Sequence, residues 1–204
     1  MKLYNSMGPN PHIVRVFAAE KGIDLPLQKV DLMGGENRRA PYNVDVNPTG
    51  QLPALELDNG TCIAEVTAIC EYLEELHPDP ILIGTNPEER AETRMWVRRI
   101  DLNIIEPMGQ GFRYAEGMKL FKNRVHCIPQ ASDDLKATAR ENLEWLDAQM
   151  EGKTYLCGDR FSLADIPLFC WLRFMSSVGQ KLDTKNKNII AWQEKVAARP
   201  SISA

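Results

Sequence analysis

Long apolar runs are absent from this 204-residue sequence, which excludes a membrane-spanning helix because such a helix needs roughly 20 consecutive apolar residues. The chain begins Met1-Lys2-Leu3-Tyr4-Asn5 and turns polar at once, unlike a secretory leader. Hydrophobic residues still make up 44% of the chain, enough to build a sizeable core. We therefore expect a soluble, cytoplasmic protein with no membrane partner.

Extended basic stretches are also absent. The 24 Lys and Arg residues are outnumbered by 28 Asp and Glu residues, which gives a formal net charge of -4. No segment has the clustered positive charge that follows a phosphate backbone, so we expect no nucleic-acid partner. Gly109-Gln110-Gly111 lacks the third glycine of a dinucleotide-binding fingerprint and lies in a predicted helix, so it does not indicate such a site.

Metal-ligating residues are few. The chain has three His and five Cys residues. No two cysteines have CxxC spacing, and the odd number argues against a disulfide framework. His126-Cys127 is the one adjacent pair of potential ligands, and nothing close to it in the sequence completes a tetrahedral set. We therefore predict no metal site.

The first part of the chain alternates short strand and helix patterns. Asn10-Pro11 predicts the start of a helix, with Asn10 as its cap, and Gly22 predicts its end. Asp58-Asn59-Gly60 predicts a tight hairpin turn. The predicted strands are 2–5, 27–32, 53–57 and 61–64, and the predicted helices are 10–21, 39–46 and 65–76. A βαβ unit followed by a hairpin and a last helix predicts an α/β domain at residues 1–76.

A segment with three prolines, residues 77–87, predicts a linker. Beyond it the pattern is helical throughout, and we predict an all-α domain over residues 88–204. Its predicted helices are 88–114, bent at Pro107, and then 131–150, 162–177 and 187–199. Ser162 and Asp165 have the spacing of a capping box, with Phe161 and Ile166 as a hydrophobic staple, which predicts a structural role.

The strongest local signal is Asn47-Pro48-Thr49-Gly50-Gln51-Leu52-Pro53, which ends at the start of a predicted strand. A cis Leu52–Pro53 bond would turn the Leu52 N–H and C=O away from the sheet, where an extended peptide can pair with them. Most bonds that precede proline are trans. The cis prediction therefore depends on the motif that follows it in the chain.

The second motif is Glu65-Val66, at which the predicted helix 65–76 begins. The exposed amides of a helix start favour an anion such as a substrate carboxylate, and Glu65 can receive a substrate ammonium group. The alternative is an acidic residue that interacts only with the dipole of its own helix.

Together these segments resemble the cytosolic glutathione transferases, whose thioredoxin-like α/β domain precedes an all-α domain. Family members carry a strand-opening cis-proline after a pattern like residues 47–53, and then Glu-Ser at the start of the next helix. The resemblance covers nearly the whole chain. It implies glutathione as co-substrate and a homodimer built largely from the predicted helices 65–76 and 88–114.

The resemblance also implies which residues bind glutathione. Gln51, Leu52 and Pro53 would hold its cysteinyl backbone, and Glu65 and Val66 its γ-glutamyl end. Val66 stands where family members usually have Ser or Thr, so a hydroxyl donor worth about 1.5–3 kcal/mol is missing, and binding is expected to be weaker.

Two loop residues are further candidates. Asn37 and Arg38 follow Gly34-Gly35 and are in a position to reach the glycyl carboxylate of glutathione. The alternative for both is an ordinary solvated loop.

The thiol-activating residue is expected between the first strand and the first helix. Residues 5–12 contain no cysteine, which disfavours the classes that use one. Asn10 is the first candidate, because Gly8-Pro9-Asn10-Pro11-His12 resembles a stretch of the bacterial Nu-class, yeast-prion-like members, in which an asparagine amide lies near the sulfur. Gly8 replaces the threonine of that stretch. Ser6 is the second candidate, and Tyr4 and His12 are alternatives.

A second substrate is expected between the domains, against Met108, Phe112 and Tyr114, with Gly109 and Gly111 leaving room for it. Met118, Trp171 and Phe174 are also expected there. The alternative is that these side chains are ordinary helix-packing residues.

The sequence thus predicts an enzyme that activates the thiol of bound glutathione for attack on a small hydrophobic electrophile, as in detoxification. Glutathione-dependent reduction of a disulfide is one alternative. A non-catalytic member of the fold that binds glutathione or another ligand is the other, and the valine at position 66 is consistent with it.

Overall fold

The computed structural model describes all residues 1–204 and contains two compact units. Met1–Ile83 together with Arg199–Ala204 form an α/β unit, and Gly84–Ala198 form a helical unit. The prediction extended the helical domain to residue 204. The structure differs because the last residues bind the first helix of the α/β unit. None of the helices is long and apolar enough to cross a membrane.

The α/β unit contains a four-stranded mixed sheet in the order β2-β1-β3-β4. Its strands are β1 (Lys2–Asn5), β2 (Leu27–Lys29), β3 (Ala54–Glu56) and β4 (Cys62–Ala64). β1 is parallel to β2 and antiparallel to β3, and β4 is antiparallel to β3. Leu3 and Leu55 pair in this sheet and are fully buried, which stabilises the unit by about 1.5–3 kcal/mol for each side chain.

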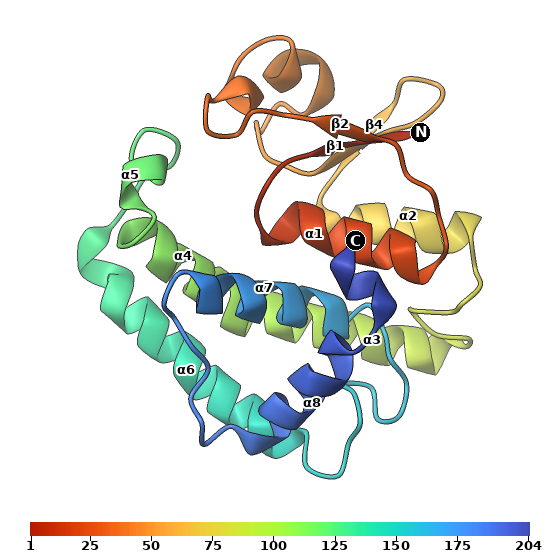
Figure 1. Ribbon diagram of the computed structural model, residues 1–204, viewed down its shortest axis with the longest axis vertical. Coiled ribbons are helices and arrows are strands. Elements are labelled where there is room, and N and C mark those ends of the chain that lie inside the picture. Colours follow the sequence, from red (N-terminus) through yellow and green to blue (C-terminus); the bar gives the residue numbers. More distant parts are fainter. The chain divides into compact units, whose positions relative to one another are not determined.

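Two helices, α1 (Pro9–Glu20) and α2 (Val66–Leu76), lie along one face of the sheet (Figure 1). Phe17 and Leu73 are among their fully buried side chains. The prediction that Asn10 caps α1 is wrong. Gly8, with φ at 110°, precedes the helix, and Asn10 is already its second residue. Because glycine adopts this conformation at little cost, the chain turns into the helix earlier than the sequence pattern indicated.

The C-terminal segment η5 (Pro200–Ser203) lies beside α1 (Figure 1). Arg199 donates two hydrogen bonds to the two Glu20 oxygens, each at 2.7 Å, and the Ser201 hydroxyl donates a third. His12 Nε2 lies 3.2 Å from Ile202 O. These contacts hold residues 199–204 against α1, so this segment belongs to the α/β unit.

The proline-rich segment after α2 is also held by side chains of this unit. The buried Lys21 ammonium donates to His77 O at 2.8 Å and to Pro80 O at 2.7 Å, and it forms an ion pair with Glu74. Glu74 Oε1 accepts a hydrogen bond from Leu82 N at 2.9 Å. The segment is therefore fixed through its backbone.

The loop from β2 to β3 contains two short turns, η1 (Glu36–Arg38) and η2 (Tyr42–Val46). η2 lies within the irregular helix predicted at 39–46, and η1 precedes that range. This loop matters for function because side chains within it hold the segment that precedes β3.

The helical unit begins with α3 (Pro87–Ile100), the wide turn η3 (Asp101–Ile105) and α4 (Glu106–Tyr114). The sequence predicted one helix bent at Pro107. The irregular turn lies just before that proline because proline lacks an N–H and its ring excludes the carbonyl four residues earlier. The remaining elements are α5 (Met118–Phe121), η4 (Pro129–Ala131), α6 (Ser132–Gln149), α7 (Asp165–Ser177) and α8 (Lys187–Ala197).

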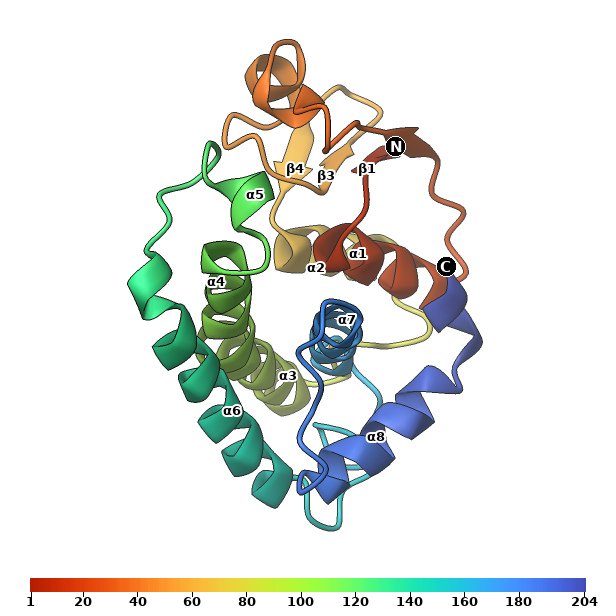
Figure 2. The ribbon, with the colours of Figure 1, turned by 60° about the vertical axis from the view of Figure 1, so that its left-hand side comes forward.

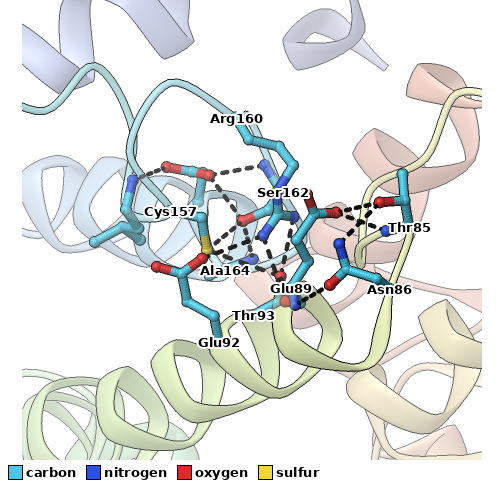
Figure 3. A network of polar contacts seen from close by, with 11 residues as sticks. Thr85, Asn86, Glu89, Glu92, Thr93, Cys157, Arg160, Ser162 and Ala164 are labelled. Atoms are coloured by element: carbon cyan, nitrogen blue, oxygen red, sulfur yellow. Dashed lines mark hydrogen bonds and ion pairs between the residues drawn. The ribbon is translucent and has the colours of Figure 1, made fainter.

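The middle of the helical unit is α7, which the other helices surround (Figure 2). A polar network fixes its start (Figure 3). Ser162 N donates to Asp165 Oδ2 at 2.9 Å, which is one half of the predicted capping box, and Ala164 N donates to Ser162 Oγ at 3.2 Å. The other half differs, because Asp165 N donates to the Ser162 backbone carbonyl at 3.1 Å. Asp165 also accepts a hydrogen bond from Trp192 Nε1 at 2.8 Å. The fully buried carboxylate therefore connects α7 to α8.

Candidate functional site

Three chain segments meet at one edge of the sheet. Tyr4 pairs with Ala54 in the antiparallel β1–β3 ladder, and Ala54 pairs with Ala64 in the antiparallel β3–β4 ladder. β1 and β4 therefore both end at the edge of the sheet where β3 begins, just after Leu52 and Pro53. The helices α1 and α2 begin shortly after Ser6 and at Val66, so both helix starts lie at this edge.

Leu52 supplies backbone groups at the edge. The Leu52–Pro53 bond is cis, as the sequence predicted. Neither the N–H nor the C=O of Leu52 makes a hydrogen bond within the chain. The two groups can therefore pair with an extended peptide lying alongside.

Side chains of the preceding loop hold this segment in place. Gln51 O accepts hydrogen bonds from Tyr42 Oη at 2.6 Å and from Asn47 Nδ2 at 3.1 Å. Burial raises the pKa of the Tyr42 hydroxyl, so Tyr42 remains a donor across the physiological range. Tyr42 was not predicted to support the site, and Asn47 was named only as the first residue of the motif that ends at Pro53. The signal for Asn47 was the Asn-Pro-Thr order, because Thr49 N and Oγ1 bond to its side chain in an Asx turn.

Asn37 and Arg38 lie against the same loop. Asn37 is 2% exposed and its Nδ2 donates to Gly50 O at 2.6 Å. Arg38 Nη1 donates to Thr49 O at 3.1 Å. Gly50 has a φ of 63°, and a Cβ there would lie 2.8 Å from Asn37 O, so glycine is needed for this close approach. The structure thus shows Asn37 supporting the loop from inside.

Glu65 and Val66 provide the second half of the edge. Glu65 has a φ of 71°, the one positive value at a residue other than glycine, a conformation that costs about 1–3 kcal/mol. Its exposed carboxylate makes no ion pair within the chain. Val66 is the first residue of α2, and no side chain caps that helix. A free carboxylate and uncapped helix amides therefore stand next to each other.

The candidates for thiol activation differ in what their polar groups contact. Ser6 Oγ donates to Val30 O at 2.9 Å, and Tyr4 Oη donates to Glu56 Oε2 at 2.7 Å. Burial and the bond to Glu56 raise the pKa of Tyr4, which makes it a poorer donor. Asn10 is the candidate that lies in the first turn of α1, where the helix dipole is positive and no acidic residue opposes it.

The residues expected to face a second substrate occupy different environments within the helical unit. Met108 is 5% exposed and belongs to the core. Phe112 is half-buried in a chain of edge-to-face aromatic rings, with centroids 6.1 Å from Phe121 and 5.3 Å from Phe174. Trp171 continues the chain 6.1 Å from Phe174. Tyr114 is half-buried at the end of α4. We call Phe112, Phe121, Phe174 and Trp171 the aromatic cluster.

The expectation that Gly109 and Gly111 leave room for a substrate is wrong. A Cβ on Gly109 would lie 3.0 Å from the Trp171 ring, and one on Gly111 would lie 3.2 Å from Ser132 O. The two glycines instead allow α4 to approach α7 and α6 closely.

No group of three or more His, Cys, Asp or Glu side chains is arranged to hold a metal ion.

Comparisons with known proteins agree with this arrangement. The family described as "Glutathione S-transferase, N-terminal domain" matches residues 7–76, and "Glutathione S-transferase, C-terminal domain" matches residues 127–200. The chain is 31% identical to glutathione S-transferase 2 of Saccharomyces cerevisiae over 96% of this chain and 84% of the relative. It is 30% identical to the glutathione S-transferase GstA of Escherichia coli O157:H7, over 99% and 95% of the two chains. A glutathione S-transferase domain-containing protein of Marinobacter aquaeolei VT8 has a similar structure, with a TM-score of 0.92, 36% identity and coverage of 99% and 100%.

Proposed function

This chain belongs to the glutathione S-transferase family and is a glutathione transferase, and we propose that it binds glutathione along the sheet edge at Leu52, with the sulfur near Asn10. The unpaired N–H and C=O of Leu52, at the sheet edge where β4 ends and α2 begins, are the observation that carries this proposal. They suit a short extended peptide with a free ammonium group and a free carboxylate at one end.

The two ends of that peptide have different partners. The Glu65 carboxylate receives the ammonium group of the γ-glutamyl residue, and the first amides of α2, beginning at Val66, receive its carboxylate. The cysteinyl N–H and C=O pair with Leu52. Gln51 and Pro53 shape this contact, and Asn37 and Arg38 support it by holding the loop.

The thiol is activated by lowering its pKa. A thiolate near the start of α1 is stabilised by the helix dipole and by the Asn10 amide. Each unit by which the pKa falls needs about 1.4 kcal/mol, so a few units suffice near neutral pH. The proton leaves to solvent and no general base is required. The thiolate then forms a bond to the electrophilic carbon, and the leaving group departs with its bonding electrons.

We further propose that the protein works as a cytoplasmic homodimer in detoxification. Exposed apolar side chains on the helices expected at the interface support a dimer. Leu76 at the end of α2 is 48% exposed, Met95 on α3 is 39% exposed, and Leu102 in η3 is 49% exposed. Light scattering at micromolar concentration tests this state, and a monomer would contradict it.

Calorimetric titration with glutathione and conjugation of a chlorodinitrobenzene test the catalytic proposal together. We expect binding, and release of chloride that depends on glutathione. Activity confined to a mixed disulfide would instead make the protein a reductase, and binding without either activity would make it a non-catalytic member.

A further inference from the structure

Arg113 in α4 is a half-buried cation with few partners. Its side chain is 27% exposed, and its one carboxylate partner, Glu106 Oε1, is 3.9 Å away. That oxygen already accepts a hydrogen bond from Gln110 Nε2 at 2.6 Å. The Arg113 guanidinium donates no hydrogen bond within the chain, although a guanidinium carries five N–H donors. A half-buried guanidinium whose one carboxylate partner is 3.9 Å away can form charge-assisted hydrogen bonds with an anionic ligand.

Arg113 also lies against the aromatic cluster. Its guanidinium carbon is 5.8 Å from the centroid of the Phe121 ring. A Cβ on Gly109 would lie 3.8 Å from Arg113 Nη2 and 3.0 Å from the Trp171 ring, so the cation and the indole approach the same turn of α4. The positive charge is therefore at the border of an apolar, aromatic surface.

The aromatic cluster itself is not closed off. Phe112, Phe121 and Phe174 are each half-buried. Their edge-to-face arrangement leaves ring surface that a further planar ring can contact, and such contacts contribute about 0.5–1.5 kcal/mol beyond the area that they bury.

Another acidic residue close to Arg113 in the chain has its own partners. Glu116, just beyond α4, is bound by Lys136 Nζ at 2.8 Å and by Gln180 Nε2 at 3.1 Å. Glu106 is therefore the one carboxylate that forms an ion pair with Arg113.

We propose that the second substrate is an aromatic electrophile that carries a carboxylate, with the carboxylate bound by Arg113 and the ring packed against Phe112, Phe121 and Phe174. The reactive step rests on the proposed function. With a haloarene, the glutathione thiolate bonds to the ring carbon, and the halide leaves with the electron pair of the broken carbon–halogen bond. The carboxylate takes no part in the reaction and serves only for recognition, through the bidentate pairing that a guanidinium offers.

The test compares two electrophiles, a chlorodinitrobenzene and a chlorodinitrobenzoate, which differ by one ring carboxylate. The measured quantity is the kcat/KM for the chlorodinitrobenzoate divided by the kcat/KM for the chlorodinitrobenzene. Arg113→Gln is expected to lower this ratio by about tenfold or more, because a charge-assisted bidentate pair is lost. Arg113→Lys keeps the positive charge but loses the paired N–H donors of the guanidinium. Its ratio should lie between those of the unmodified protein and Arg113→Gln. Glu106→Gln removes the competing carboxylate and should raise the ratio.

Lys119→Gln is the matched control, because it makes the same charge change at an exposed position of α5, and its ratio should stay within about twofold of the unmodified protein. The proposal is overturned if Arg113→Gln leaves the ratio unchanged or if Lys119→Gln lowers it equally. Circular dichroism shows whether each variant folds. If Arg113→Gln does not fold, the Arg113→Lys and Glu106→Gln ratios decide.

If the protein turns over neither electrophile, the proposed function is wrong. Calorimetry then tests separately whether Arg113 binds the carboxylate, with unreactive dinitrobenzoate and dinitrobenzene as probes. Tighter binding of the acid that is lost in Arg113→Gln supports a carboxylate site, whereas equal binding of both probes overturns it.

Discussion

The hydroxyl of Ser6 donates its hydrogen bond to the backbone carbonyl of Val30, at 2.9 Å. Ser6 directly follows β1, and Val30 directly follows β2, so this bond fastens the loop between β1 and α1 to the neighbouring strand. The hydroxyl proton is therefore directed away from a ligand at the Leu52 edge, which distinguishes Ser6 from Asn10 in the first turn of α1.

The first prediction compares these two residues. Asn10→Ala should raise the pKa of bound glutathione by about 1–2 units, because a hydrogen bond to a charged group contributes about 1.5–3 kcal/mol. Turnover near neutral pH should fall, with a much smaller change in glutathione affinity. Ser6→Ala should have a mild effect. The measurement is the pH–rate profile of both variants. Loss of activity in Ser6→Ala with an unchanged profile for Asn10→Ala would identify a serine-type enzyme instead.

The second prediction concerns Glu65. Glu65→Ala removes the proposed partner of the γ-glutamyl ammonium, and we expect the KM for glutathione to rise about tenfold or more while kcat changes little. Steady-state kinetics at varied glutathione measure both constants. Glu75→Ala, which makes the same change at an exposed position near the other end of α2, serves as the control. An equal rise in both variants would show that only the general charge of the helix matters.

The third prediction tests the residue that departs from the family pattern. Val66→Ser places a hydroxyl at the start of α2, and the added donor should strengthen glutathione binding by about 1.5–3 kcal/mol at most. Calorimetric titration gives the dissociation constants. Thr67→Val, one position further along the helix, should leave affinity nearly unchanged. Affinity that is unaltered by Val66→Ser would mean that the helix amides alone hold the carboxylate.

The fourth prediction concerns Glu20, which binds Arg199 and Ser201. Burial by itself raises the Glu20 pKa, but the hydrogen bonds from Arg199 and Ser201 outweigh it, so the net pKa lies below its usual range. A carboxylate whose pKa is lower in the folded state stabilises the fold above its unfolded pKa, and that stability is lost as the pH falls through the folded pKa.

Glu20→Gln should therefore lower the free energy of unfolding near neutral pH by about 1–3 kcal/mol, and the difference from the unmodified protein should shrink in acid, as the pH falls through the lowered pKa of Glu20. Urea unfolding at neutral and at acidic pH measures this. Asp24→Asn, at an exposed site shortly after α1, is the control. A difference that stays constant with pH would show that the Glu20 contact contributes through packing alone.

Sequence patterns anticipated much of the fold. The apolar periodicity, the Asp58-Asn59-Gly60 turn and the prolines near residue 80 gave the order of strands and helices, and β1 begins and ends where it was predicted. The motif ending at Pro53 indicated the edge with the unpaired backbone groups. These features depend on neighbouring residues, so local physical chemistry determines them.

Contacts between distant parts of the chain were decided only by the tertiary structure. Strand pairing brings the ends of β1 and β4 to the start of β3, and the bond from Ser6 to Val30 could not be inferred from either residue alone. Asn37 looked like an exposed loop residue and is buried under Gly50. The hydrogen bond from Arg199 to Glu20 joins residues near opposite ends of the chain. A side chain's partner depends on what the fold brings within hydrogen-bonding distance, and periodicity and propensity carry no information about that.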